Sequence, residues 1–130
     1  MSVDTENMRY NMTMWQGATF KLAINVKDSN NANLNLTDYA AFMQIRETYD
    51  SGAVVESLTT SNGEISLDEA NGVLALELSA DRTANITVDL TSSSIPPKTV
   101  YVYDIDLEDS NNKITKILFG TVEVYGEVTR

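Results

Sequence analysis

Apolar and polar residues alternate with a period of two along several stretches of the chain, most clearly over residues 20–27. A β-strand with one face in a core and the other in water has this period. A helix would distribute the same apolar side chains around its circumference. A cluster of turn-forming residues, 28–33, follows. We therefore predict a first central strand here, against which other apolar segments fold. The alternating residues are Phe20, Leu22, Ile24 and Val26 against Lys21, Ala23, Asn25 and Lys27.

Further segments show the same alternation or a weaker form of it, and each is predicted as a strand. They span residues 8–15, 40–47, 54–60, 65–67, 73–79, 99–108 and 114–125. Trp15 breaks the alternation of the first segment. Asn62-Gly63 predicts a hairpin between two neighbouring segments, because this dipeptide suits the turns that join antiparallel strands. Gly120 interrupts the last segment, where we expect a bulge or a close backbone approach.

One helical turn and several loops complete the expected architecture. Residues 79–85 are the single helical candidate, with Ser79 as N-cap and Asp81 in the first turn. Pro96 and Pro97 place residues 91–97 in a loop, because neither can donate to a strand ladder. Short strands at roughly 8–12-residue spacing with turn signals between them predict an antiparallel sandwich. We expect one domain over 1–130, with a flexible N-terminal arm over 1–7 and a C-terminal tail over 126–130.

Composition excludes several function classes. The chain of 130 residues is long enough to bury a core, and its net charge is -10, which argues against nucleic-acid binding. Cysteine and histidine are both absent. Disulfides, Cys/His zinc sites and catalytic triads with a histidine base are therefore excluded. No apolar run approaches the ~20 residues of a membrane span, and the polar, acidic start lacks the features of a signal peptide.

Acidic side chains line one face of a predicted strand. Asp104, Asp106 and Glu108 alternate with apolar residues and so lie about 7 Å apart in steps of two. A calcium site or a carboxylate pair for acid–base catalysis is one interpretation. The solvated outer face of a sandwich is the interpretation that we favour, because no EF-hand loop is present and glycosidase carboxylates come from different strands.

Two turns of similar sequence carry oxygen-bearing side chains. Residues 22–31 resemble residues 103–112, and we interpret both as segments with the same turn chemistry rather than as a duplication. A loop calcium site is conceivable if both turns lie at the same end of the sandwich, but turn formation alone explains the composition. The residues are Asp28, Asn30, Asn31, Asp109, Asn111 and Asn112.

Aromatic residues offer a further candidate site, a platform for stacking sugars. In a sandwich of this size most of them are core or interface residues. We expect Tyr101 and Tyr103 to be buried, with their hydroxyls bonded to backbone groups. No residue is assigned as catalytic, cofactor-binding or metal-binding, and no cofactor is expected. The aromatic residues considered are Tyr10, Trp15, Tyr39, Tyr49, Tyr101, Tyr103 and Tyr125.

Short phrases recur in a set order from Tyr10 onward. They are WQGATF (15–20), LTDYA (36–40), MQIR (43–46), GVLAL (72–76), VYDI (102–105), GTV (120–122) and the ending EVTR (127–130). In this layout the chain resembles small structural proteins of tailed-bacteriophage virions, and it is similar to the immunoglobulin-like N-terminal domains of phage baseplate upper proteins. The resemblance implies an all-β fold, an antiparallel immunoglobulin-like β-sandwich of about seven to nine strands with one short helical turn near 80–85.

The resemblance also implies a function without enzymatic activity. The expected protein is a virion structural component of the tail, baseplate or neck, assembled in the host cytoplasm. It would bind other virion proteins in many copies or as a homo-oligomer, with no nucleic-acid or membrane partner. The alternatives are a capsid decoration (cement) protein, a carbohydrate-binding module for host attachment and a carboxylate-based hydrolase. For the last, the sequence supplies only a stripe of carboxylates on one strand.

Overall fold

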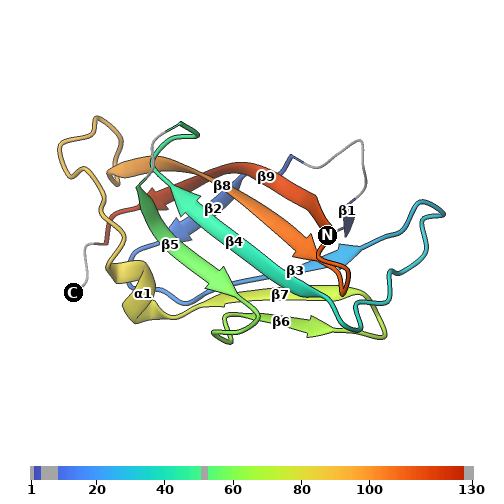
Figure 1. The fold of residues 1–130 in the computed structure, drawn as a ribbon. Helices are drawn as coiled ribbons and strands as arrows, with labels where there is room; N and C mark the ends of the chain where they lie inside the picture. Colours follow the sequence, from blue (N-terminus) through green and yellow to red (C-terminus); the bar gives the residue numbers. More distant parts are fainter. Residues whose placement is uncertain (1, 4–8, 51–52, 128–130) are drawn as a thin grey trace.

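The chain folds into two β-sheets packed face to face, with one short helix at one end (Figure 1). The computed structural model describes residues 2–3, 9–50 and 53–127. The first sheet has the order β2 (Met12–Trp15), β9 (Ile114–Tyr125), β8 (Lys98–Glu108), β4 (Ala40–Arg46) and β5 (Val54–Thr59). The second has the order β1 (Ser2–Val3), β3 (Phe20–Val26), β7 (Val73–Leu78) and β6 (Ile65–Asp68). The predicted all-β sandwich, consistent with an immunoglobulin-like fold, is confirmed.

Most neighbouring strands are antiparallel, as predicted, but two pairs are parallel. β2 runs parallel to β9, and β1 runs parallel to β3. In both pairs the strand comes from the N-terminal segment and lies at the edge of its sheet. The N-terminal part of the chain therefore contributes β1 to the edge of one sheet and β2 to the edge of the other. The period-two pattern alone does not specify this arrangement.

The core lies between the two sheets and follows the predicted alternation. Along β7 the three leucines are buried and the residues between them are half-buried or exposed. β8 shows the same alternation over its whole central part. The fully buried side chains of both sheets form one cluster with Leu36 of the β3–β4 connection, and its sheet members include Met12, Ile24, Met43, Ile45, Leu58, Leu74, Leu76, Ile105 and Leu118.

β3 (Phe20–Val26) is one residue shorter than the predicted central strand of residues 20–27, and its burial is uneven. Ile24 is fully buried, whereas Phe20 and Leu22 on the same face are only half-buried. β3 pairs with β7 over six residues and lies inside the smaller sheet. The middle strand of the larger sheet is β8, which pairs with both β9 and β4.

The hairpin predicted at Asn62-Gly63 is wrong. β5 pairs with β4, and β6 pairs with β7, so the strands on either side of this turn belong to different sheets. The turn itself forms, because Asn62 Oδ1 accepts hydrogen bonds from the backbone N–H groups of Thr59 (3.1 Å) and Glu64 (3.0 Å). Leu58 before the turn and Ile65 after it are both buried. Leu58 reaches the core from the larger sheet and Ile65 reaches it from the smaller sheet. The chain therefore crosses from one sheet to the other at this turn.

Of the two alternatives predicted at Gly120, the structure shows the close backbone approach. The bulge of β9 lies at Ile117, three residues earlier. The β8–β9 register skips Ile117, whereas Gly120 pairs regularly with Tyr103. A Cβ atom on Gly120 would lie 2.2 Å from the carbonyl oxygen of Tyr10. The absent side chain therefore makes room for the segment that leads into β2.

The predicted helical turn is confirmed as α1 (Ala80–Ala84). Ser79 is its N-cap and accepts a hydrogen bond from the backbone N–H of Arg82 at 3.3 Å. Thr83 is fully buried, and its hydroxyl donates to the carbonyl of Ala18 at 2.9 Å. This bond ties α1 to the turn between β2 and β3.

The two terminal predictions fall partly outside the described residues. In the predicted arm, only Ser2 and Val3 are described, and they pair with Asn25 and Val26 of β3. In the predicted tail, the backbone N–H of Gly126 donates to Pro97 O at 2.7 Å, and residues 128–130 lie outside the described part. Among the described residues, no helix has the length and apolar character required to cross a membrane.

Candidate interaction surface

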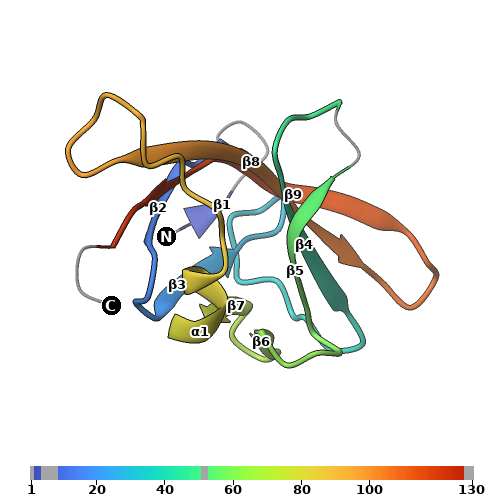
Figure 2. The same ribbon diagram turned by 90° about the vertical axis from the view of Figure 1, so that its left-hand side faces the viewer.

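The long loop between α1 and β8 lies at the same end of the sandwich as α1 (Figure 2), and exposed apolar side chains gather there. They come from the end of β2 and from the long loop between α1 and β8. Ile95 is 98% exposed, Leu90 58% and Trp15 48%. Together with Pro96 and Pro97 they form what we call the end surface. A shallow hollow in it is lined by Trp15, Gln16, Ile95, Pro96, Pro97, Gly126 and Glu127.

Trp15 is held on the end surface by a row of neighbours across three strands. Its ring stacks on Tyr125 of β9, with 4.7 Å between the ring centroids and 21° between the planes. Lys98 of β8 continues the row, with its Nζ 5.9 Å from the Tyr125 ring centroid. The same Nζ lies 2.8 Å from Glu123 Oε1, and this hydrogen bond raises the pKa of Lys98. Trp15 is therefore both exposed and fixed in place.

Hydrogen bonds hold the loop that presents Ile95. The backbone N–H of Lys98 donates to Ser92 Oγ at 3.1 Å, and Ser94 Oγ donates to Pro96 O at 2.9 Å. At the start of the loop, Asp89 Oδ1 accepts from the backbone N–H and the hydroxyl of Thr91, which lowers the pKa of Asp89. A side chain on such a braced loop loses less conformational freedom when a partner covers it.

Gly126 joins the loop to the end of β9. A Cβ atom at Gly126 would lie 3.1 Å from Pro97 Cγ and 3.5 Å from Leu90 Cδ2. Both apolar side chains thus lie over the glycine backbone. The end surface is therefore one continuous patch built from β2, the loop and the end of β9.

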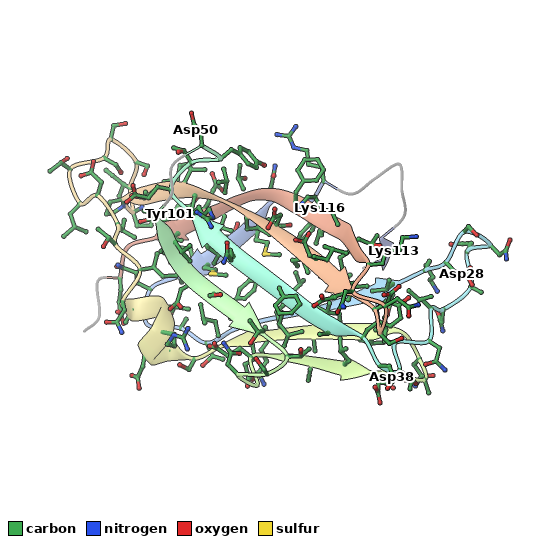
Figure 3. All side chains as sticks on the ribbon, in the orientation of Figure 1. Asp28, Asp38, Asp50, Tyr101, Lys113 and Lys116 are labelled. Atoms are coloured by element: carbon green, nitrogen blue, oxygen red, sulfur yellow. The ribbon has the colours of Figure 1, made fainter. Side chains whose placement is uncertain are left out.

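The acidic stripe lies on the outer face of β8, as the alternation predicts. Lys116 of β9 neutralises part of it, because its Nζ lies 2.6 Å from Asp104 Oδ2 and 3.1 Å from Asp106 Oδ1 (Figure 3). Within the described residues, no group of three or more acidic side chains is arranged to hold a metal ion. All three carboxylates of the stripe, Asp104, Asp106 and Glu108, line a shallow groove on this face together with Phe42 and Ile114.

The aspartates of the two similar turns are engaged in their own turns. Asp28 Oδ1 accepts from the backbone N–H groups of Asn30 (2.8 Å) and Ala32 (3.0 Å). Asp109 Oδ1 accepts from Asn111 and Lys113, both at 2.9 Å. Both turns lie away from α1 (Figure 3). These contacts follow the predicted turn chemistry, and they bond Asp28 and Asp109 each to its own turn.

The prediction that Tyr101 and Tyr103 are buried is confirmed. They are 4% and 2% exposed, and their hydroxyls donate to the backbone carbonyls of Thr87 and Tyr10. Burial raises the pKa of both phenols. Tyr49 is 67% exposed, but it lies beyond β4 and away from Trp15 in the sequence and in the sheet. The remaining candidates, Tyr10, Tyr39 and Tyr125, are half-buried.

Sequence reasoning missed the end surface. Trp15 continues the alternation on the exposed face of β2, so the apparent break is an apolar residue at a position that normally carries a polar one. Ile95 is an isolated apolar residue between four Ser/Thr residues and two prolines. An apolar residue at an outward strand position and another in a polar loop are the signals that point to this surface.

Comparison with known proteins adds no identification. No protein-family model matches the sequence, and no curated protein matches it either.

Proposed function

We propose that this chain is a non-enzymatic structural protein of a tailed-bacteriophage virion, located in the tail, baseplate or neck. In this role it binds other virion proteins in multiple copies, and the end surface is one of its contacts. The virion assignment comes from the resemblance in sequence layout. The observation that carries the binding role is the exposure of Trp15 and Ile95 side by side with Pro96 and Pro97.

The end surface has the composition of a protein-binding site. Aromatic residues are enriched at interfaces, and a tryptophan that is both exposed and fixed is a frequent anchor. An isolated exposed isoleucine needs no explanation, but a continuous apolar patch on an otherwise acidic chain does. Burying the exposed parts of Trp15, Leu90 and Ile95 would favour association through the hydrophobic effect.

Immunogold labelling of purified phage particles tests the location. Gold at the tail tip, baseplate or neck supports the proposal, whereas gold over the whole head identifies a decoration protein instead. Where intact particles are not labelled, mass spectrometry of the particle proteins decides between a covered subunit and a protein that is not part of the virion. The second result would contradict the proposal.

Variants of the end surface test the binding role. We expect Trp15→Ser with Ile95→Ser to reduce incorporation into particles, because the partner loses its apolar contact. Val54→Ser is the matched control, since Val54 is 43% exposed on β5 at the opposite edge of the same sheet. Thermal melting of the purified variants separates loss of binding from loss of folding. Equal incorporation of both variants would contradict a role for the end surface.

A carbohydrate-binding module is the second candidate, and the stacked pair of Trp15 and Tyr125 favours it. Trp15 is the single tryptophan of the chain, so its fluorescence reports directly on this surface. A saturable change of emission on titration with bacterial cell-wall glycans would favour the carbohydrate module. An unchanged spectrum with glycans, together with incorporation that depends on Trp15, favours the structural role.

A further inference from the structure

Within the part of the chain that the structure describes, strand β3 has an open edge from Phe20 to Ile24. One side of β3 pairs with β7 from Phe20 to Asn25. On the other side, within the described residues, β1 pairs only with Asn25 and Val26. The stretch from Phe20 to Ile24 therefore has no described strand beside it. An open strand edge is a template for pairing with another chain.

The other sheet edges are shorter or are protected. β2 and β6 have four residues each. β5 has a register irregularity opposite Ile45 and Arg46, and its Glu56 pairs in register with the inward-facing Ile45. Bulges, inward charges and short strands are the usual ways in which sheets prevent edge-to-edge pairing. β3 has an uninterrupted register with β7 and no proline, and its one charged side chain, Lys21, is on the outer face and paired with Glu77.

The backbone groups of β3 alternate between its two sides. The N–H of Val26 donates to Gly72 O, on the side of β7, at 2.8 Å. Leu22 and Ile24 share this direction, since alternate residues of a strand direct their N–H and C=O groups to the same side. Lys21 and Ala23 therefore direct theirs to the open edge.

The side chains next to the open edge leave the core partly uncovered. Phe20 and Leu22 face the core but are only half-buried, whereas Ile24 on the same face is fully buried. On the outer face, Lys21 pairs with Glu77 at 3.1 Å, and its neighbour Ala23 is exposed and small. A strand added here would bury more of Phe20 and Leu22 and would leave space for a long side chain opposite Ala23.

We infer that β3 pairs antiparallel with β3 of a second copy of this chain, around a two-fold axis at Leu22. In this register Leu22 lies opposite Leu22, Phe20 opposite Ile24, and Lys21 opposite Ala23. The backbone N–H and C=O groups of Lys21 and Ala23 face the open edge. In each copy they then form hydrogen-bonded pairs with Ala23 and Lys21 of the other copy. A two-fold contact uses the same surface twice, and this edge is self-complementary in both backbone direction and side-chain size. The inference does not depend on the virion assignment.

Charge variants at Ala23 test this register by analytical ultracentrifugation of the full chain at fixed salt. The wild type is expected to show a concentration-dependent dimer. In the dimer, residue 23 of each copy faces Lys21 of the other copy. Ala23→Lys therefore creates two repulsive lysine pairs per dimer, whereas Ala23→Glu creates two attractive glutamate–lysine pairs. We expect the dissociation constant to rise in the first variant and to fall in the second, each by roughly two- to thirty-fold. A wild type that is monomeric throughout, or equal dissociation constants in both variants, overturns the inference.

Proline variants test the backbone contact independently. Ala23→Pro removes an N–H that faces the open edge, so the variant should fold and lose the dimer. Ile24→Pro removes an N–H that faces β7 and should lower the melting temperature strongly. Dimers that persist in a folded Ala23→Pro variant would overturn the inference. Ile95→Ser is expected to leave the dimer unchanged, which distinguishes this contact from the end surface.

Discussion

The hydroxyl of Tyr103 donates a hydrogen bond to the backbone carbonyl of Tyr10, 2.6 Å away, and joins residues 93 positions apart in the sequence. The same carbonyl oxygen lies over Gly120, the register partner of Tyr103 on β9. The N–H of Tyr10 donates to Phe119 O at 2.9 Å. Three contacts therefore fix the segment that enters β2 against the middle of the β8–β9 pair.

Tyr103→Phe is expected to destabilise the protein by about 1–2 kcal/mol, because the carbonyl of Tyr10 loses its donor in a buried place. The measurement is the free energy of unfolding by urea. Tyr49→Phe is the control, since Tyr49 is 67% exposed. Equal stability of the Tyr103→Phe variant and the wild type would show that the bond does not contribute.

Stability is expected to fall as the pH rises above about 10, the ordinary pKa of tyrosine in an unfolded chain. Burial raises the pKa of Tyr101 and Tyr103 in the folded protein. Above the unfolded pKa the unfolded chain loses these protons while the folded chain still holds them, so the unfolded state gains stability. Urea unfolding at a series of pH values checks this. Above about pH 10 the free energy of unfolding should fall less steeply with pH in Tyr103→Phe than in the wild type. Equal slopes in the two proteins would contradict a raised pKa of Tyr103.

Gly120→Ala is expected to destabilise the protein by roughly 1–3 kcal/mol. The added Cβ would lie 2.2 Å from Tyr10 O, and this oxygen cannot move without breaking the bond to Tyr103. Gly63→Ala is the comparison, because no atom lies within 4 Å of a Cβ there and only its positive φ of 86° opposes alanine. Melting temperatures of both variants measure the difference. A larger loss for Gly63→Ala would contradict the importance of the Tyr10 contact.

Arg82 of α1 links the two sheets at the side where β5 and β6 form the edges. Its Nε lies 2.9 Å from Glu56 Oε2 on β5, and its Nη1 lies 2.8 Å from Glu64 Oε2, next to β6. The two carboxylate side chains are only 12% and 15% exposed. The hydrogen bond and the charge of Glu56, with a smaller effect of Glu64, raise the pKa of Arg82.

Arg82→Met is expected to cost about 2–3 kcal/mol, since it leaves two largely buried carboxylates without their cation. Adding Glu56→Gln and Glu64→Gln to the same chain should restore most of the loss. Lys116→Met is the control, because the ion pairs of Lys116 with Asp104 and Asp106 lie on the partly exposed outer face of the sheet and contribute little. The measurement is the free energy of unfolding of each variant. No recovery in the triple variant would show that Arg82 acts through packing instead of charge.

Period-two alternation predicted the strands and the inward residues, because burial of one face is a local property of the sequence. It placed Ile24, Leu74 and Ile105 in the core, and all three are fully buried. The partners of each strand are not local. The turn at Asn62 forms as its residues dictate, but whether the next strand pairs beside the last one or crosses to the other sheet depends on the whole core.

The candidate site was harder to predict than the core. The end surface combines Trp15, Leu90 and Ile95, which are separated by up to 80 positions and meet only after the sheets form. Exposed apolar residues have no periodic pattern that marks them. The acidic stripe and the turn oxygens, by contrast, are regular in the sequence, and the structure assigns their main contacts to Lys116 and to the turns themselves.

The turns at Asp28 and Asp109 allow a matched test of local chemistry. In both, the aspartate N–H donates to the carbonyl four residues on, and the residue three positions on has a positive φ, 62° at Asn31 and 63° at Asn112. We expect Asp28→Ala and Asp109→Ala each to cost about 1 kcal/mol, and the asparagine variants to cost less, because an amide oxygen still accepts both hydrogen bonds. Melting curves with calcium and with a chelator should coincide for the parent. A calcium-dependent increase in melting temperature that disappears in either alanine variant would instead indicate a bound ion, because the turn bonds alone do not respond to calcium.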